Sequence, residues 1–315
     1  MGLIKLGKVS LDGTKVKANA SKHRALSWGH ACKIEKQLQA EVAELMRLAQ
    51  EADAADIPAE MDIPEELTRR QDRLTAIADA KEKIKQRAEE RYSREKQQYD
   101  EKVAARKAKA EKTGKKPRGR EPKPPQSGLR DKDQVNLTDE ESRIMPSSNG
   151  FKQAYNAQAS VDLDTMVIVA AHVSQSPNDK QEVVPTIEAL RSLPEAAGAV
   201  DTLLADTGYF SESNVESCTE AEIEPLISTG RQAHNQPLQE RFSQPEELPE
   251  HSSLVDKMKH YLKTSTCRQL YAKRKSTVEP VFGIIKDVMG FRQFLLRGHE
   301  AVSSEYGYLC PLPGI

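Results

Sequence analysis

The sequence predicts an α/β protein in which a mixed sheet with flanking helices is interrupted by a long helical hairpin insertion. Strand-like and helical segments follow one another on either side of residues 29–125, an order typical of α/β domains. Within residues 29–125, apolar side chains recur at helical spacing. Charged residues make up 30% of the chain, aromatic residues 5%, and the mean hydropathy is −0.68. Part of the chain is therefore expected to be solvated helix.

A length of 315 residues suits either two modest domains or one domain with a large insertion, and the element order favours the second. We expect a first strand region at 1–28, the helical insertion with a basic, proline-rich tail at 29–125, the remainder of the sheet domain at 126–301 and a C-terminal tail at 302–315.

Composition excludes several classes of protein. The net charge of −1 gives no global attraction to nucleic acid, so any basic surface must be local. No segment approaches the length and apolarity of a membrane span, so we expect no membrane partner. The four cysteines are widely separated and form no CxxC pair, which predicts reduced thiols in a cytoplasmic protein.

The first element is a strand within residues 3–18. Val9 and Leu11 alternate before Asp12-Gly13-Thr14, which predicts a strand that runs into a turn and places Asp12 at its carboxyl end. The alternative is an ordinary turn aspartate, because Asp-Gly is a common turn pair.

The insertion reads as two helices joined by a proline-containing break at 55–64. The apolar stripe of the second helix is thin, which predicts partial solvation or pairing with another chain. Residues 81–124 hold 17 basic and 8 acidic side chains, a local net charge of 17 − 8 = +9. Mixed charges at helical spacing usually form a solvated face, so only the acid-poor stretch 112–124 favours a nucleic-acid contact.

The second half returns to sheet. Residues 151–161 and 166–173 predict a hairpin that turns at 162–164, where Asp162 and Asp164 are interpreted as turn residues. A helix is expected from Asn178, with Asp179 as its cap. A buried strand then ends at Asp206, a helix begins near Ser211, and 223–227 predicts a further strand. Residues 231–253 show no clear element.

The last informative window is 271–286, where a single acid lies among cations. Side chains spaced four, four, four and three residues apart would share one helical face: Tyr271, Lys275, Glu279, Gly283 and Lys286. A second, apolar side is expected to pack on the sheet: Val281, Ile284, Ile285 and Val288. Alternatively, Ser276 and Glu279 form a capping box with Pro280 in the first turn, and this window by itself favours the cap.

Taken together, Asp12, Asp206 and Glu279 predict a metal site. If the strands that carry the two aspartates are neighbours, three carboxylates converge at one edge of the sheet. Their mutual repulsion would be relieved by hard divalent cations, and oxygen ligands without nearby His or Cys favour Mg²⁺ or Mn²⁺. Two such ions can activate a hydroxyl and stabilise a leaving oxygen, which indicates phosphoryl transfer on nucleic acid.

These motifs together resemble the DDE transposases of bacterial insertion sequences, in the subgroup with a Tyr, Arg, Glu and Lys signature around the last acid. The resemblance extends from about residue 2 to residue 300 and is carried by residues 11–21, 136–145, 154–158, 204–209, 275–286 and 290–298. It implies a ribonuclease-H-like catalytic domain with Asp12, Asp206 and Glu279 as the catalytic and metal-binding triad.

The resemblance also implies DNA as the partner, both as transposon end and as target, and a homodimer. Hydrolysis at the transposon end would free a 3′ hydroxyl that attacks the target strand. In the signature, Arg274 and Lys275 compete for the arginine position, because each keeps only one of the two expected spacings. The expected DNA contacts are Tyr271, Arg274, Lys275, Lys286, Lys15 and Lys17.

Both ends depart from this family. Its members carry a helical DNA-binding region before the Asp-Gly-Thr motif, and the tail here breaks at Pro311 and Pro313. We therefore expect a gene truncated at both ends, with weak or no autonomous transposition. The alternative is a catalytically idle DNA- or partner-binding protein that uses the helical arm and basic tail. A glycosidase reading is weaker, since few aromatic residues are available to stack on sugars.

Overall fold

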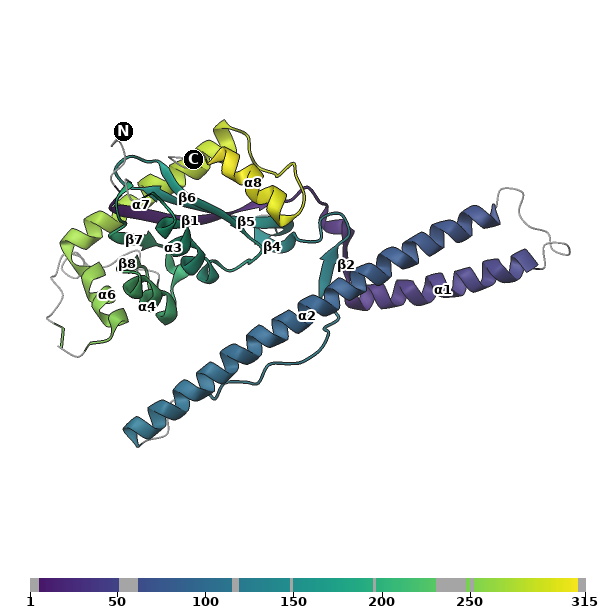
Figure 1. The fold of residues 1–315 in the computed structure, drawn as a ribbon, viewed down its shortest axis with the longest axis horizontal. Coiled ribbons are helices and arrows are strands. Elements are labelled where there is room, and N and C mark those ends of the chain that lie inside the picture. Colours follow the sequence, from purple (N-terminus) through teal and green to yellow (C-terminus); the bar gives the residue numbers. More distant parts are fainter. Residues whose placement is uncertain are drawn as a thin grey trace. The chain divides into compact units, whose positions relative to one another are not determined.

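The computed structural model describes residues 6–50, 62–114, 119–147, 150–194, 197–230, 248–249 and 252–310. The chain forms two compact units. Residues 1–22 and 138–315 form one, here called the sheet unit, and residues 23–137 form the other, here called the arm unit. Figure 1 shows the helices and strands of both units.

Among the residues that the structure describes, the sheet unit is built on six strands: β1 (Lys8–Lys17), β4 (Arg143–Ser147), β5 (Gly150–Asp162), β6 (Ile168–Ser174), β7 (Thr202–Ala205) and β8 (Glu224–Ile227). The order is β4-β5-β1-β7-β8, with β6 also paired to β5. Strands β1, β7 and β8 are parallel, whereas β5 is antiparallel to β1, β4 and β6. This mixed sheet with flanking helices confirms the predicted α/β fold class and is consistent with a ribonuclease-H-like domain.

The helices of the sheet unit are α3 (Val183–Arg191), α4 (Glu212–Glu220), α6 (Leu254–Lys263), α7 (Ser265–Gly283) and α8 (His299–Leu309). Shorter turns lie at Asp179–Gln181 and Thr207–Tyr209, and a π-helical turn at Ile284–Val288. Because side chains alternate across a strand, β1 contributes to two cores. Val9 and Leu11 pack in the core that includes α3 and α4, while Val16 packs in the core with α7 and α8.

One prediction for β1 is wrong. Asp12, Gly13 and Thr14 do not form a turn after the strand, because β1 continues through them to Lys17. The reason is β5, whose backbone pairs with β1 without interruption from Val9 to Lys17. Continuous ladder hydrogen bonds on that edge outweigh the turn preference of Asp-Gly.

The other predicted elements of this unit are largely confirmed. Strands β5 and β6 form the expected hairpin, and Asp162 accepts hydrogen bonds from the Thr165 amide and hydroxyl in the turn, at 2.9 and 2.7 Å. Strand β7 ends before Asp206, and Ser211 caps α4. The helix expected from Asn178 is a 3₁₀ turn followed by α3, and Asn178 is the cap instead of Asp179. Most of 231–253 lies outside the described residues.

The arm unit contains α1 (Trp28–Gln50), α2 (Ile63–Thr113) and a two-stranded ladder of β2 (Ala25–Ser27) and β3 (Gln134–Asn136). The helical hairpin is therefore confirmed, although 51–61, which hold most of the predicted break, lie outside the described residues. Its narrow core holds Leu26, Ala31, Leu38, Ile77, Ala80, Ile84 and Val135. Asp62 caps the start of α2, and Gly114 in the left-handed conformation ends it.

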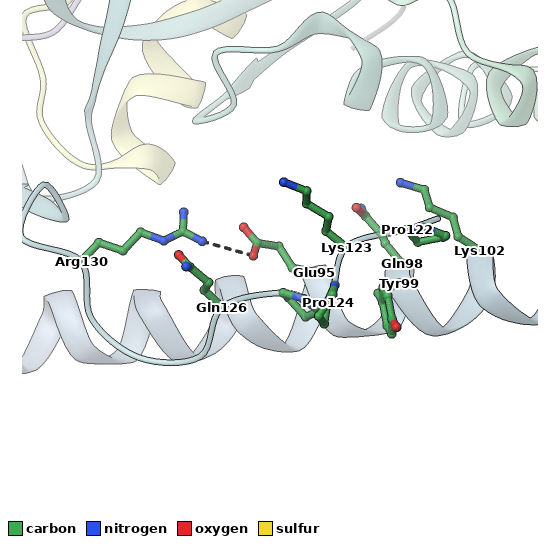
Figure 2. A pocket seen from close by; sticks show the side chains of 10 residues that line it. Glu95, Gln98, Tyr99, Lys102, Pro122, Lys123, Pro124, Gln126 and Arg130 are labelled. Atoms are coloured by element: carbon green, nitrogen blue, oxygen red, sulfur yellow. Dashed lines mark hydrogen bonds and ion pairs between the residues drawn. The ribbon is translucent and has the colours of Figure 1, made fainter. Parts of the chain in front are cut away.

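Beyond the part of α2 that packs on α1, the chain returns along the same helix. Arg106 donates to the Gly119 carbonyl at 2.8 Å, and Arg130 forms an ion pair with Glu95 at 3.4 Å. An open groove of about 390 Å³ lies between α2 and this return segment (Figure 2). Its lining is Glu95, Gln98, Tyr99, Lys102, Pro122, Lys123, Pro124, Pro125, Gln126 and Arg130. Part of the basic stretch 112–124 lies outside the described residues.

Two predictions from composition can be compared with the structure. All four cysteines lie in the described ranges and are free thiols, as expected. None of the helices in those ranges combines the length and the apolar character that crossing a bilayer requires.

Candidate active site

Asp12 and Asp206 lie at neighbouring positions of two parallel strands. Ser10 of β1 pairs with Leu204 of β7, so the same register brings Asp12 opposite Asp206, the first residue after β7. Paired residues of neighbouring strands direct their side chains to the same face of a sheet. The two carboxylates, 194 residues apart in sequence (206 − 12), therefore meet at one edge.

Asp12 is held in a mostly buried environment. Its Oδ1 accepts a hydrogen bond from the Gly13 amide at 2.8 Å, and its side chain is 22% exposed. Burial raises the pKa of the Asp12 carboxyl, against the opposing effects of the Gly13 amide and the Arg274 guanidinium. The negative charge of Asp206 raises this pKa further. Excess negative charge at this edge therefore favours a cation.

The Asp206 side chain is fixed by the turn that follows β7. It accepts a hydrogen bond from the Gly208 amide at 2.7 Å and so caps the 3₁₀ turn Thr207–Tyr209. A Cβ atom at Gly208 would lie 2.9 Å from Asp206 Oδ1, so a side chain there would push the carboxylate away. This explains why the aspartate is followed so closely by glycine.

Glu279 lies inside α7 and not at its beginning. The helix begins after Thr264, whose hydroxyl accepts from the Cys267 amide, and continues through Glu279 and Pro280 to Gly283. The hydroxyl of Ser276 donates to the Lys273 carbonyl at 3.0 Å instead of capping. The capping-box interpretation, with Pro280 in a first turn, is therefore wrong.

Arg274 connects the acids. One guanidinium nitrogen lies 3.4 Å from Asp12 Oδ2, and the other lies 3.9 Å from Glu279 Oε1. The arginine side chain is 9% exposed and its Nε atom is buried without a hydrogen-bond partner. Lys275, the competing candidate for the arginine position, is exposed. Tyr271 donates its hydroxyl to the Ala205 carbonyl at 2.9 Å, next to Asp206.

Lys286 approaches the same edge through the π-helical turn. The Met289 amide bonds to the Ile284 carbonyl at 2.9 Å, five residues back, and the Lys286 ammonium donates to the Thr14 hydroxyl. The wide turn also changes which residues are buried. Ile285 is 3% exposed, whereas Ile284 and Val288 are 51% and 79% exposed, so these two do not belong to the predicted apolar face.

A lysine that the sequence patterns did not single out extends this basic area. Burial lowers the pKa of Lys286, and the nearby charge of Lys152 lowers it further. Burial likewise lowers the pKa of Lys152, and the next cause is the charge of Lys17, an exposed residue on β1. The charge of Lys152 is therefore close enough to repel those of both Lys17 and Lys286, and an anionic group beside Lys152 would relieve that repulsion.

Lys15 and Asp179 form an ion pair, with 2.9 Å between the Lys15 ammonium and Asp179 Oδ1. The contact of Lys15 with DNA stays a prediction. Asp179 was predicted as a helix cap, yet the Asn178 side chain makes that bond to the Lys180 amide. The sequence does hold a signal against Asp179 as the cap. Asn178, directly before it, is a good capping residue by itself and leaves the Asp179 side chain available for another role.

The donor set of this edge fits a hard divalent cation only in part. Asp12 and Asp206 offer oxygen ligands, and burial, together with the nearby charge of Asp206, raises the pKa of the Asp12 carboxyl. Within the described ranges, however, no three His, Cys, Asp or Glu side chains are arranged to hold one metal ion. Glu279 is linked to Asp12 through the Arg274 guanidinium and not directly.

Comparison with known proteins identifies the family. The model of the transposase DDE domain matches residues 131–310, which include Asp206 and Glu279 but neither β1 nor the helices of the arm unit. Searches of curated proteins and of solved structures found no match to the chain. DDE transposase domains generally use divalent metal ions and act on DNA. The match covers more than half of the chain, and the protein therefore belongs to the family of DDE-domain transposases.

Proposed function

We propose that this protein is a DNA transposase that catalyses metal-dependent phosphodiester hydrolysis and strand transfer at insertion-sequence ends. The observation that carries the proposal is the pairing of β1 with β7, which brings Asp12 and Asp206 together beneath α7. Family membership supports the same chemistry independently, because the matched region contains two of the three proposed acids.

In this proposal Asp12, Asp206 and Glu279 hold Mg²⁺ or Mn²⁺. When bound, a pair of such ions supplies an activated water or 3′ hydroxyl and stabilises the leaving oxygen. Arg274 keeps the carboxylates together before metal arrives, because its guanidinium is within 4 Å of both Asp12 and Glu279. Glu279, with a side chain 54% exposed, has the freedom to move toward the two aspartates.

The cations around the carboxylates are proposed to bind the phosphates of the DNA strand. Lys152 is repelled by both Lys286 and Lys17, so a phosphate beside Lys152 would replace repulsion by attraction. Arg274, rather than Lys275, takes the arginine position of the Tyr, Arg, Glu and Lys signature, since only Arg274 reaches the acids. This supports assignment to the subgroup that carries that signature.

The test uses the full chain and DNA duplexes that contain the sequences flanking the gene. With Mn²⁺ or Mg²⁺ we expect cleavage that chelation abolishes, and Asp206→Asn should lower its rate by roughly 100-fold or more. The matched control is Asp164→Asn, an exposed residue of the β5–β6 turn, which should cleave like the unmodified chain. Metal-independent cleavage, or equal activity of both variants, would contradict the proposal.

The second candidate function is DNA or partner binding by the arm unit without chemistry. The local net charge of 17 − 8 = +9 over residues 81–124 favours it, as does the groove beside the return segment. DNA binding that weakens steeply with salt, without cleavage under any metal condition and with no effect of Asp206→Asn, would support this second function and exclude the first.

A further inference from the structure

Behind the candidate active site, on the opposite face of β1, polar side chains form a second cluster. Strands β1 and β5 pair Gly13 with Gln158 and Lys15 with Asn156. Because side chains alternate along a strand, these residues lie on the face opposite to Asp12 and Thr14. Gln158 and Asn156 are fully buried, so their amide groups need partners inside the protein.

Asp179 is the partner that these side chains share. Its Oδ1 accepts hydrogen bonds from Asn156 Nδ2 at 2.7 Å, from Lys15 Nζ at 2.9 Å and from Gln158 Nε2 at 3.2 Å. One carboxylate oxygen therefore binds three side chains of the β1–β5 ladder, one on β1 and two on β5. Such charge-assisted bonds are stronger than bonds between neutral groups, which fixes this part of β1.

Gln158 extends the cluster to the turn that carries Asp206. The Gln158 Oε1 atom accepts a hydrogen bond from the fully buried Tyr209 hydroxyl at 2.5 Å. The Gln158 amide passes so close to Gly13 that a Cβ there would lie 2.8 Å from its Cδ atom. Glycine at position 13 is therefore what lets Gln158 bind Asp179 and Tyr209 together.

The second oxygen of Asp179 lies on the same side as the Asp206 turn. A Cβ atom at Gly208 would be 3.6 Å from Asp179 Oδ2 and 2.9 Å from Asp206 Oδ1, so both carboxylates flank that glycine. Asn214 adds a further tie, since its Nδ2 donates to the carbonyls of Lys180 at 2.8 Å and Tyr209 at 2.7 Å. The segment of Asp179 and the turn of Asp206 are thus connected twice.

We propose that Asp179 is a positioning residue that sets the relative placement of Asp12 and Asp206. It acts on Asp12 through the β1–β5 ladder and on Asp206 through Gln158 and Tyr209, and it neutralises Lys15. As a positioning role for a metal-binding pair, this inference rests on the function proposed above. The competing interpretation is an ion pair that only stabilises the fold.

The experiment compares Asp179→Ala and Asp179→Asn with Asp164→Ala and Asp164→Asn in the full chain. Cleavage of the flanking-sequence duplex is measured against Mn²⁺ concentration, and DNA affinity is measured separately. Removing outer partners of metal ligands typically costs 10–100-fold, so Asp179→Ala should raise the Mn²⁺ concentration for half-maximal cleavage by about that factor. DNA affinity should stay unchanged, because Asp179 is proposed to act on the metal-binding acids and not on DNA. Asp179→Asn keeps an acceptor oxygen and should be intermediate.

Hydrogen exchange gives a readout that does not depend on activity. Peptides covering residues 202–212 should exchange faster in Asp179→Ala than in Asp164→Ala, while peptides of the arm unit should not change. A variant that unfolds would accelerate exchange everywhere, and Asp179→Asn then provides the decisive comparison.

The outcomes separate the two proposals. If the unmodified chain shows no Mn²⁺-dependent cleavage, the proposed function fails, while Mn²⁺ binding by calorimetry and the exchange pattern still test the positioning role. An Asp179→Ala variant with unchanged Mn²⁺ dependence, or with equal loss of stability and activity but no shift in that dependence, would overturn the inference. Weakened DNA binding as the sole effect would do the same, because it would assign the effect to Lys15.

Discussion

The sheet unit and the arm unit use polar side chains in opposite ways. In the sheet unit Asn156 and Gln158 are fully buried and bonded to residues from several elements. In the arm unit many ion pairs keep part of their side chains in solvent, as with Arg70 and Glu41, which lie 2.8 Å apart with side chains 26% and 34% exposed. Removing one partner of a buried hydrogen bond lowers the free energy of unfolding strongly, because the other partner is left without a bond. When one partner of an exposed pair is removed, water takes its place and the cost is small. Substitutions should therefore propagate through the sheet unit and remain local in the arm unit.

The largest effect on stability is expected in the sheet unit, for Leu203→Ala. Leu203 is fully buried on β7 and packs in the core with α3 and α4. Truncation should lower the free energy of unfolding of the sheet unit by about 2–5 kcal/mol. Urea denaturation measures the free energy of unfolding, and limited proteolysis shows which unit opens. Faster cleavage in the arm unit alone would contradict the expectation that the substitution acts in the sheet unit.

A smaller effect is expected for Gly13→Ala, which places a methyl group against the Gln158 amide. Overpacking at this site should reduce stability by about 1–3 kcal/mol. The double variant Gly13→Ala with Gln158→Ala should lose less stability than the two single variants lose together, because the added methyl group no longer meets the Gln158 amide. Additive effects in urea denaturation would mean that Gln158 moves aside without cost.

The smallest of these effects is expected in the arm unit, for Asp62→Ala. Asp62 caps α2 through its bond to the Glu65 amide at 3.2 Å, and loss of such a cap costs about 1 kcal/mol. Circular dichroism during thermal unfolding reports it. Asp72→Ala, at an exposed position within α2, is the control and should be neutral or slightly stabilising. Reduced Mn²⁺-dependent cleavage by Asp62→Ala would contradict a local effect.

Local patterns predicted those elements whose signals come from neighbouring residues. The β5–β6 hairpin has its turn aspartate, Ser211 caps α4, and β7 ends at Asp206 as expected. Helical periodicity likewise predicted both helices of the arm unit. In each of these cases the determining interactions lie within a few residues of one another.

The errors arose where a distant partner decides the outcome. Asp12 lies within a strand because β5, about 150 residues away, supplies the ladder (159 − 12 = 147 residues to its partner Ala159). Glu279 lies inside a helix because Thr264 had already capped it upstream. Asp179 is directed to Gln158 and Lys15, contacts that no local pattern encodes. The proposed acids and Arg274 could be named from the sequence, whereas the contacts of Asp179 with Lys15, Asn156 and Gln158 could not.

Because a π-helical turn lies at Ile284–Val288, the number of residues between Glu279 and Lys286 decides where the Lys286 side chain points. Deleting one residue there would shorten the wide turn to an ordinary helical one and rotate every following side chain about the axis. All signature residue types would survive such a gap, yet the ammonium would no longer reach the Thr14 hydroxyl. Homologous genes that lack one residue in this turn would thus be expected to encode inactive proteins, even if all the signature residues are present.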